Sequence, residues 1–217
     1  STEFTCHYVA FDLVEINGES QSIHSIEDRK KVLQTLFKSI KLPLSVEREN
    51  PHLIQAIDVY RHHKTVWKKV QVGHGEGIVA KEKSSRWESD HRTGQWLKIK
   101  NWKYVTVILT KYDKKNGFFH GSIFNKEKLV EVVTFKHGLS EDERKTLSTL
   151  FQSNGIRSEE GTWRLEPSIC VDIATIDFDG KHMREPRFHA FNLEKSSDDC
   201  TWRHMQRQLF PLPERVQ

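Results

Sequence analysis

Two short runs of residues combine acids and bases at a spacing suited to phosphate chemistry. The run from Glu76 to Lys81 reads EGIVAK, and the run from Trp96 to Lys100 reads WLKIK. Because side chains alternate across a strand, Lys98 and Lys100 should point to the same side of the second run. Two ammonium groups on an otherwise apolar strand are costly without an anionic partner. A polyphosphate is such a partner, and Glu76 could hold the divalent metal that accompanies it.

Positive charge is concentrated around these two runs. Residues 60–103 contain 11 Lys or Arg and 4 Asp or Glu, whereas the formal net charge of the whole chain is only +4. A solvated helix face accounts for Lys64, Lys68 and Lys69, but it does not account for the two lysines in the apolar run. The layout therefore favours a basic surface that binds an anion.

The composition indicates a protein of the cytoplasm. The 217 residues suffice for one large or two modest domains. No apolar run has membrane-spanning length, and the first residues lack the pattern of a signal peptide. The three cysteines, Cys6, Cys170 and Cys200, are odd in number and far apart, which fits a reducing compartment. The twelve histidines show no spacing typical of metal ligands, so we predict no zinc site. The missing apolar run leads us to predict no membrane partner.

The first half of the chain alternates strands with helices. Ser25 is followed three residues later by Asp28, as at the N-terminus of a helix, and apolar residues then recur at helical spacing. The pattern predicts a strand from Thr5 to Ile16, a helix after Ser25, a helix from about Val59 to Gln71, and strands at about 77–82 and 96–101.

The second half reads as a series of short strands with one helix. Ser140 and Glu143 form a capping box, and Asn154-Gly155 ends the helix that follows. The expected strands are 104–110, 117–124, 129–136, 162–165 and 169–177. A helix after the third of five strands is typical of the OB barrel. We therefore predict an α+β chain whose two domains span residues 1–103 and 104–217.

Together these features resemble the ATP-dependent DNA ligases of the covalent nucleotidyltransferases, and in particular the bacterial end-joining ligases. The segment from Tyr8 to Val14 resembles the strand whose aromatic side chain stacks on adenine, which would be Phe11. The helix that opens with Asp28-Arg29-Lys30-Lys31 follows it as in the family. The run 76–81 resembles the motif whose glutamate supports the metal, and the run 96–100 resembles the motif whose lysines hold the α-phosphate region.

The resemblance implies a fold, an activity and a set of site residues. The first domain would be the C-terminal half of a nucleotidyltransferase domain, and an OB-fold β-barrel would follow it. The protein would seal nicked or broken duplex DNA with ATP and Mg²⁺ or Mn²⁺, through lysyl-AMP and DNA-adenylate. Bacterial Ku would be a partner, and the nucleoid of the bacterial cytoplasm the location. The implied residues are Glu76, Lys98 and Lys100 for catalysis, Glu76 for the metal, and Phe11, Lys81, Arg92 and Lys195 for the nucleotide.

Two departures from the family pattern bear on activity. The nucleophilic lysine of the family lies in a Lys-x-Asp-Gly motif upstream of the adenine strand, and no such motif occurs here. We therefore expect the chain to be the C-terminal part of a ligase core, inactive by itself, and Lys111 to Lys114 to be a turn. In the closing motif Asn192 stands where the family has an arginine that orients pyrophosphate, with Arg184 and Arg187 as candidate substitutes.

Other interpretations remain open at the level of sequence. An RNA ligase or an mRNA capping enzyme of the same superfamily would carry similar motifs. A non-catalytic nucleic-acid-binding module with an OB fold would also fit, because a fold alone does not give a function. Taken singly, Phe11 would be a core aromatic residue, and Trp96 and Trp102 are expected to be packing residues.

Overall fold

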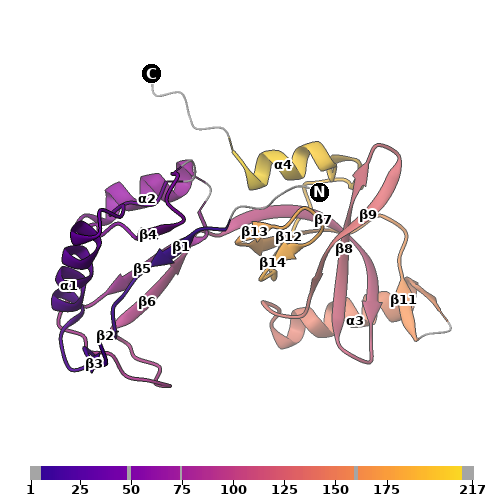
Figure 1. Ribbon diagram of the computed structural model, residues 1–217. Coiled ribbons are helices and arrows are strands. Elements are labelled where there is room, and N and C mark those ends of the chain that lie inside the picture. The colour runs from indigo at the N-terminus through magenta and orange to yellow at the C-terminus, as the bar shows by residue number, and fades with distance from the viewer. Residues whose placement is uncertain (1–5, 48–49, 74, 159–160, 212–217) are drawn as a thin grey trace. The chain divides into compact units, whose positions relative to one another are not determined.

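The computed structural model describes residues 6–47, 50–73, 75–158 and 161–211, and these residues divide into two compact units (Figure 1). Unit 1 consists of the residues up to Lys69 together with Gly77–Ile99. Unit 2 consists of Val70–Glu76 and the residues from Lys100 onward. The predicted domain limits, 1–103 and 104–217, concern the family domains and stay predictions.

Unit 1 contains short strands and one long helix. Its elements in chain order are β1 (Tyr8–Ala10), β2 (Glu15–Ile16), β3 (Glu19–Ser20), α1 (Ile26–Ser39), β4 (Ile54–Ala56), the start of α2 (His63–Val72), β5 (Gly77–Lys81) and most of β6 (Trp96–Lys100). β1 pairs with β4 in parallel, β2 with β3 as a hairpin, and β5 with β6. The strands predicted at about 77–82 and 96–101 are confirmed as β5 and β6.

Helix α1 forms where its cap and apolar spacing predict it. The Ser25 hydroxyl accepts a hydrogen bond from the Asp28 backbone N–H at 3.1 Å, which confirms the N-cap. One helix face is buried, and Leu33 and Phe37 on it pack with Ala10 of β1 and Ala56 of β4. This small core places α1 beside the end of β1.

Three predictions for unit 1 are corrected. The strand expected from Thr5 to Ile16 ends at Ala10 and resumes only at Glu15, and Thr5 lies outside the described residues. The two strands belong to different sheets, because Tyr8 to Ala10 pair with β4, whereas Glu15 and Ile16 pair with β3 across the Asn17-Gly18 turn. The second helix begins at His63, and three-residue β4 was missed because a strand this short carries no pattern of its own.

Unit 2 is built on a seven-stranded sheet with two helices. Its strands are β7 (Lys103–Asp113), β8 (Phe118–Asn125), β9 (Lys128–Phe135), β10 (Ile156–Arg157), β11 (Thr162–Arg164), β12 (Cys170–Thr175) and β15 (Arg187–Phe191), with the small pair β13 (Asp177–Phe178) and β14 (Met183–Arg184) outside it. The two helices are α3 (Glu141–Asn154) and α4 (Trp202–Leu209), and a 3₁₀ turn at Ser197–Asp199 precedes α4.

The long strand β7 organises this sheet. Its first half, Lys103 to Ile108, pairs antiparallel with β12, and its second half pairs with β8 and β11. β15 lies on the other side of β12, and the Phe188 N–H donates to the His137 carbonyl just after β9 at 2.8 Å. The predicted series of strands omitted β15, and β11 lies between β10 and β7 in the sheet. β15 was missed because its five residues have no regular alternation and depend on pairing with β12.

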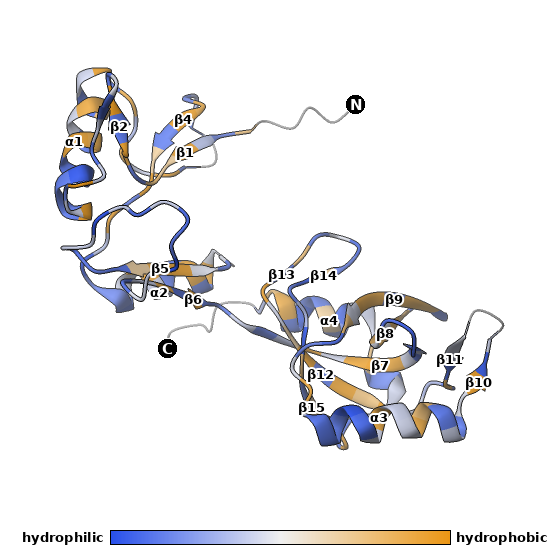
Figure 2. Ribbon diagram, turned by 90° about the horizontal axis from the view of Figure 1, so that it is seen from below, coloured by the Kyte–Doolittle hydropathy of each residue, from blue (hydrophilic) through white to orange (hydrophobic). Residues whose placement is uncertain are grey.

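Aromatic and branched side chains fill the interior of unit 2. The Tyr112 and Phe119 rings stack with centroids 4.6 Å apart, and Leu147 and Phe151 of α3 are fully buried against this cluster. The capping box between Ser140 and Glu143 is confirmed. The apolar colour of β7, β9 and β12 and the mixed colour of α3 show the same division between core and solvent (Figure 2).

The cysteines are free thiols. The Sγ atoms of Cys170 and Cys200 lie 3.6 Å apart in the core of unit 2, and burial raises the pKa of both thiols. Among the described residues, no helix combines the length and apolar character needed to cross a membrane.

Candidate functional site

Unit 1 holds the Lys81 ammonium between two aromatic rings. The Lys81 Nζ lies 5.0 Å from the ring centroid of Phe11 and 3.8 Å from that of Trp96. The Glu82 N–H donates to the Gln95 carbonyl at 2.9 Å, which joins the end of β5 to the start of β6 and so brings Lys81 beside Trp96. Both contacts are close enough for cation–π attraction. The predicted residues Phe11 and Lys81 are therefore neighbours.

The surroundings of Lys81 change its proton affinity. The side chain is half-buried, and burial lowers the pKa of its ammonium to about 8. The Asp12 carboxylate acts in the opposite direction, and the nearby positive charges of Lys30 and Arg29 act with burial. Lys81 can thus change charge near physiological pH.

Phe11 is not a core residue. Its side chain is 51% exposed although it directly follows the buried Ala10 at the end of β1. An aromatic ring with a cation near it and solvent around the rest can accept a nucleobase by stacking.

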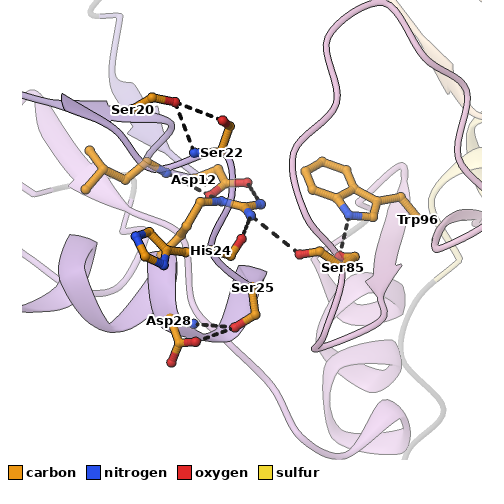
Figure 3. A network of polar contacts seen from close by, with 10 residues as sticks. Asp12, Ser20, Ser22, His24, Ser25, Asp28, Ser85 and Trp96 are labelled. Carbon is orange, nitrogen blue, oxygen red and sulfur yellow. Dashed lines mark hydrogen bonds and ion pairs between the residues drawn. The ribbon is translucent and has the colours of Figure 1, made fainter. Parts of the chain in front are cut away.

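Asp12, the residue that follows Phe11, belongs to a buried ion pair that sequence reasoning missed (Figure 3). Arg29 of α1 is 0% exposed, and its Nε and Nη2 donate to the two carboxylate oxygens of Asp12 at 3.0 and 2.9 Å. Its Nη1 donates to the carbonyls of His24 at 2.6 Å and Ser85 at 3.4 Å. The available signal was that Arg29 occupies the apolar stripe of its helix, where a buried arginine requires a carboxylate partner.

Trp96 is also connected to this network. Its Nε1–H donates to the Ser85 hydroxyl at 3.0 Å, and Ser85 is buried (Figure 3). Trp96 is a packing residue, as expected, and the Lys81 ammonium lies against the face of its ring.

In unit 2, two predicted catalytic residues form ion pairs with adjacent residues at the end of β14. The Arg184 guanidinium pairs with the Glu76 carboxylate, and the Lys100 ammonium pairs with the carboxylate of Glu185. This hydrogen bond from Lys100 lowers the pKa of Glu185. All four side chains keep substantial exposure, so both pairs can exchange with solvent or with a ligand. Sequence reasoning did not foresee these pairs, because they join residues more than eighty positions apart.

The remaining predicted residues lie at the surface. Lys98 is exposed on β6, and Arg92 is exposed in the loop between β5 and β6. Lys195 is half-buried in the segment after β15. Among the described residues, no group of three or more His, Cys, Asp or Glu side chains gathers in a geometry suited to a metal ion.

Asn192, the residue in the expected arginine position, has a structural role. Its Nδ2 donates to both carboxylate oxygens of Asp172 at 3.0 and 3.2 Å, and the Thr106 hydroxyl donates to the same carboxylate at 2.7 Å. Of the two candidate substitutes, Arg184 pairs with Glu76, and the Arg187 guanidinium lies 5.8 Å from the Trp102 ring centroid.

Comparison with known proteins identifies relatives of both units. Residues 1–100 match the model of the ATP dependent DNA ligase domain. The chain is 32% identical over 212 residues to the bifunctional non-homologous end joining protein LigD of Bacillus subtilis, covering 98% of this chain and 35% of that protein. It is 22% identical to a DNA ligase of Thermococcus fumicolans, covering 94% of this chain and 39% of that ligase.

A solved structure of a Lig E DNA ligase has a similar fold. It matches with a TM-score of 0.53 at 14% identity, over 86% of this chain and 63% of that one. At this identity the match shows the fold alone, an α+β fold of the ligase type. The chain spans about a third of the length of the first curated relatives, 35% and 37%. The chain is thus a LigD-like homologue over nearly its whole length, and its residues 1–100 match the ATP-dependent DNA ligase domain.

Proposed function

We propose that this chain is part of an ATP-dependent ligase that seals nicked or broken duplex DNA through lysyl-AMP and DNA-adenylate intermediates. Residues 1–103 are the C-terminal half of the nucleotidyltransferase domain, and residues 104–217 are its OB-fold domain. One observation carries the proposal: Lys81 is held between Phe11 and Trp96, residues that come from three separate motifs of the family. The family match over residues 1–100 supports it.

The candidate residues have side chains suited to bind ATP. The exposed ring of Phe11 stacks on adenine, and the ammonium of Lys81 contacts a phosphate oxygen. Lys98 and Lys100 neutralise charge at the α-phosphate, and Arg92 and Lys195 bind the outer phosphates. Catalysis of nucleotidyl transfer consists mainly of positioning and charge neutralisation, to which these cations contribute.

Glu76 is a suitable but incomplete site for Mg²⁺ or Mn²⁺. Mg²⁺ commonly takes one or two carboxylates together with phosphate oxygens, and the exposed carboxylate of Glu76 can be one of them. Arg184 and a metal cation would compete for the Glu76 carboxylate, because the Arg184 Nη1 already donates to its Oε1. The metal would neutralise charge on the phosphates at the reacting phosphorus.

The proposal extends to partners and location. The substrate is nicked or broken duplex DNA, and the working site is the bacterial nucleoid. The relative in Bacillus subtilis is named as a non-homologous end joining protein, which is the basis for including bacterial Ku as a partner.

Formation of an AMP adduct tests the proposed function. We expect the natural protein that contains this chain to gain the mass of one AMP when incubated with ATP and Mg²⁺. The 217-residue chain alone should gain none, because it has no Lys-x-Asp-Gly motif. Intact mass spectrometry measures both. An adduct on the isolated chain would place the nucleophile within it, with Lys111 the first residue to examine, and would overturn our assignment of the motifs.

Sealing assays separate the proposal from its alternatives. A DNA ligase joins nicked DNA faster than nicked RNA of the same sequence, and the reverse preference would indicate an RNA ligase. A protein that binds DNA but forms no AMP adduct would instead be a non-catalytic module.

The pKa of Lys81 predicts how ATP binding depends on pH. The ammonium form exists below pH about 8 and is lost above it, so the attraction for phosphate falls as pH rises through that value. We expect the KM for ATP in adduct formation to be about tenfold higher at pH 9 than at pH 7. Lys81→Arg keeps its charge over this range and should remove the pH step. The same step in Lys81→Arg would mean that another group titrates.

A further inference from the structure

We propose that Arg29 is a positioning residue of the nucleotide site, because it fixes the two aromatic rings that flank Lys81. This inference rests on the proposed function, in which Phe11 and Lys81 contact the nucleotide. Arg29 acts on the two rings indirectly, through Asp12 on one side and Ser85 on the other.

The first branch of the network fixes Phe11. Asp12 is the next residue in the chain, and both of its carboxylate oxygens accept hydrogen bonds from the Arg29 guanidinium. Its Oδ1 also accepts from the Leu13 N–H at 2.8 Å. The Asp12 carboxylate therefore links the backbone that leaves β1 to the Arg29 guanidinium, although this stretch is no longer in a strand. This holds the base of the exposed Phe11 side chain in one place.

The second branch fixes Trp96. The Ser85 carbonyl accepts from the Arg29 Nη1 at 3.4 Å and from the Ile26 N–H at 2.8 Å, so the loop after β5 is tied to the start of α1. The Ser85 hydroxyl accepts from the Trp96 indole N–H at 3.0 Å (Figure 3). The ring that contacts Lys81 is thereby oriented by a buried serine.

The two branches meet at one guanidinium, which explains why a charged pair is buried here. A buried ion pair contributes little net stability compared with apolar residues of the same volume, so stability is a weak reason for its presence. The planar guanidinium offers donors in fixed directions, and here it uses them toward Asp12, His24 and Ser85. A lysine could supply the positive charge, but it could not donate hydrogen bonds to all three of these partners at once.

The test uses two variants. Ser85→Ala removes the hydroxyl that accepts from the Trp96 indole N–H and leaves the Asp12 contacts in place. Arg29→Lys keeps the positive charge but loses the planar guanidinium that bonds both oxygens of Asp12. Ser84→Ala is the matched control, because Ser84 is the neighbouring serine, is exposed and bonds only the Glu82 side chain among the described contacts. The pKa of Lys81 is measured from its ¹³Cε shift in the ¹³C-lysine-labelled chain, with the signal assigned by Lys81→Arg. The charged groups that act on this pKa are Asp12, Lys30 and Arg29. Ser85→Ala removes none of them, so any shift reports the geometry around the amine.

We expect Ser85→Ala and Arg29→Lys to move the Lys81 pKa upward from about 8, because a loosened ring admits water to the amine. In the natural protein, the same variants should raise the KM for ATP about tenfold and leave kcat of adduct formation within about twofold, as expected for one lost orienting hydrogen bond. Ser84→Ala should change neither quantity.

An unchanged Lys81 pKa in Ser85→Ala and Arg29→Lys would overturn the positioning role, and so would an unchanged KM. Failure of the proposed function is a different result, since the unmodified natural protein would then form no AMP adduct. The pKa measurement on the chain needs no activity, so the positioning of Lys81 is tested in either case.

Discussion

Replacing both Lys98 and Lys100 by alanine in the natural protein should reduce sealing of nicked DNA by at least about a thousandfold. A single preorganised group that stabilises charge at a reacting centre contributes about 10² to 10³ in rate, and our proposal assigns two such cations to the α-phosphate region. The fold should tolerate the change, because Lys98 is exposed and the Lys100 ammonium pairs with the exposed carboxylate of Glu185. Gel assays of nick closure measure the rate, and thermal unfolding monitors the fold.

The matched control for this variant is Lys64→Ala combined with Lys68→Ala on α2. It removes the same charge from exposed positions of the same basic segment. We expect it to seal within a few-fold of the natural protein, since general attraction to DNA is all that it weakens. If the Lys98 and Lys100 variant seals as well as this control, the phosphate site lies elsewhere.

Gly138→Ala should destabilise unit 2 by about 3 kcal/mol or more. Gly138 has φ +94°, and an added Cβ would lie 2.2 Å from the carbonyl oxygen and 2.7 Å from the nitrogen of Phe188. These are backbone atoms of β15 beside the hydrogen bond to His137, so they cannot move aside without opening the sheet there. Denaturant unfolding of the 217-residue chain, followed by circular dichroism, gives the free energy of unfolding.

Gly180→Ala separates the clash from the backbone strain. Gly180 has nearly the same φ, +96°, but nothing lies within 4 Å of its added Cβ. We expect this variant to lose only about 1 kcal/mol, the cost of a left-handed backbone for an alanine. Equal losses in the two variants would show that the contact between β15 and the segment after β9 is not needed for stability.

Local patterns were sufficient to predict α1, α3 and the strands that carry Lys81 and Lys98, but not the end of β1 before Phe11. The cap at Ser25 and the capping box at Ser140 act within one turn of a helix, and both helices form where those signals lie. The strands around Lys81 and Lys98 also follow from their own apolar residues and turn signals. Such signals depend on residues close in sequence, so the sequence contains them in full.

The surroundings of these residues depended on the tertiary structure. The Asp12–Arg29 pair spans 17 positions, and Arg29 reaches Ser85 across 56, so no local pattern specifies either contact. The same holds for β15, which forms only by pairing with β12. Burial, and with it the pKa of Lys81, arises when distant segments pack together. The sequence by itself therefore determined which chemical groups this protein carries and on which elements, whereas the tertiary structure alone decided which of them meet and with what charge, because packing and electrostatic energies depend on distance in space.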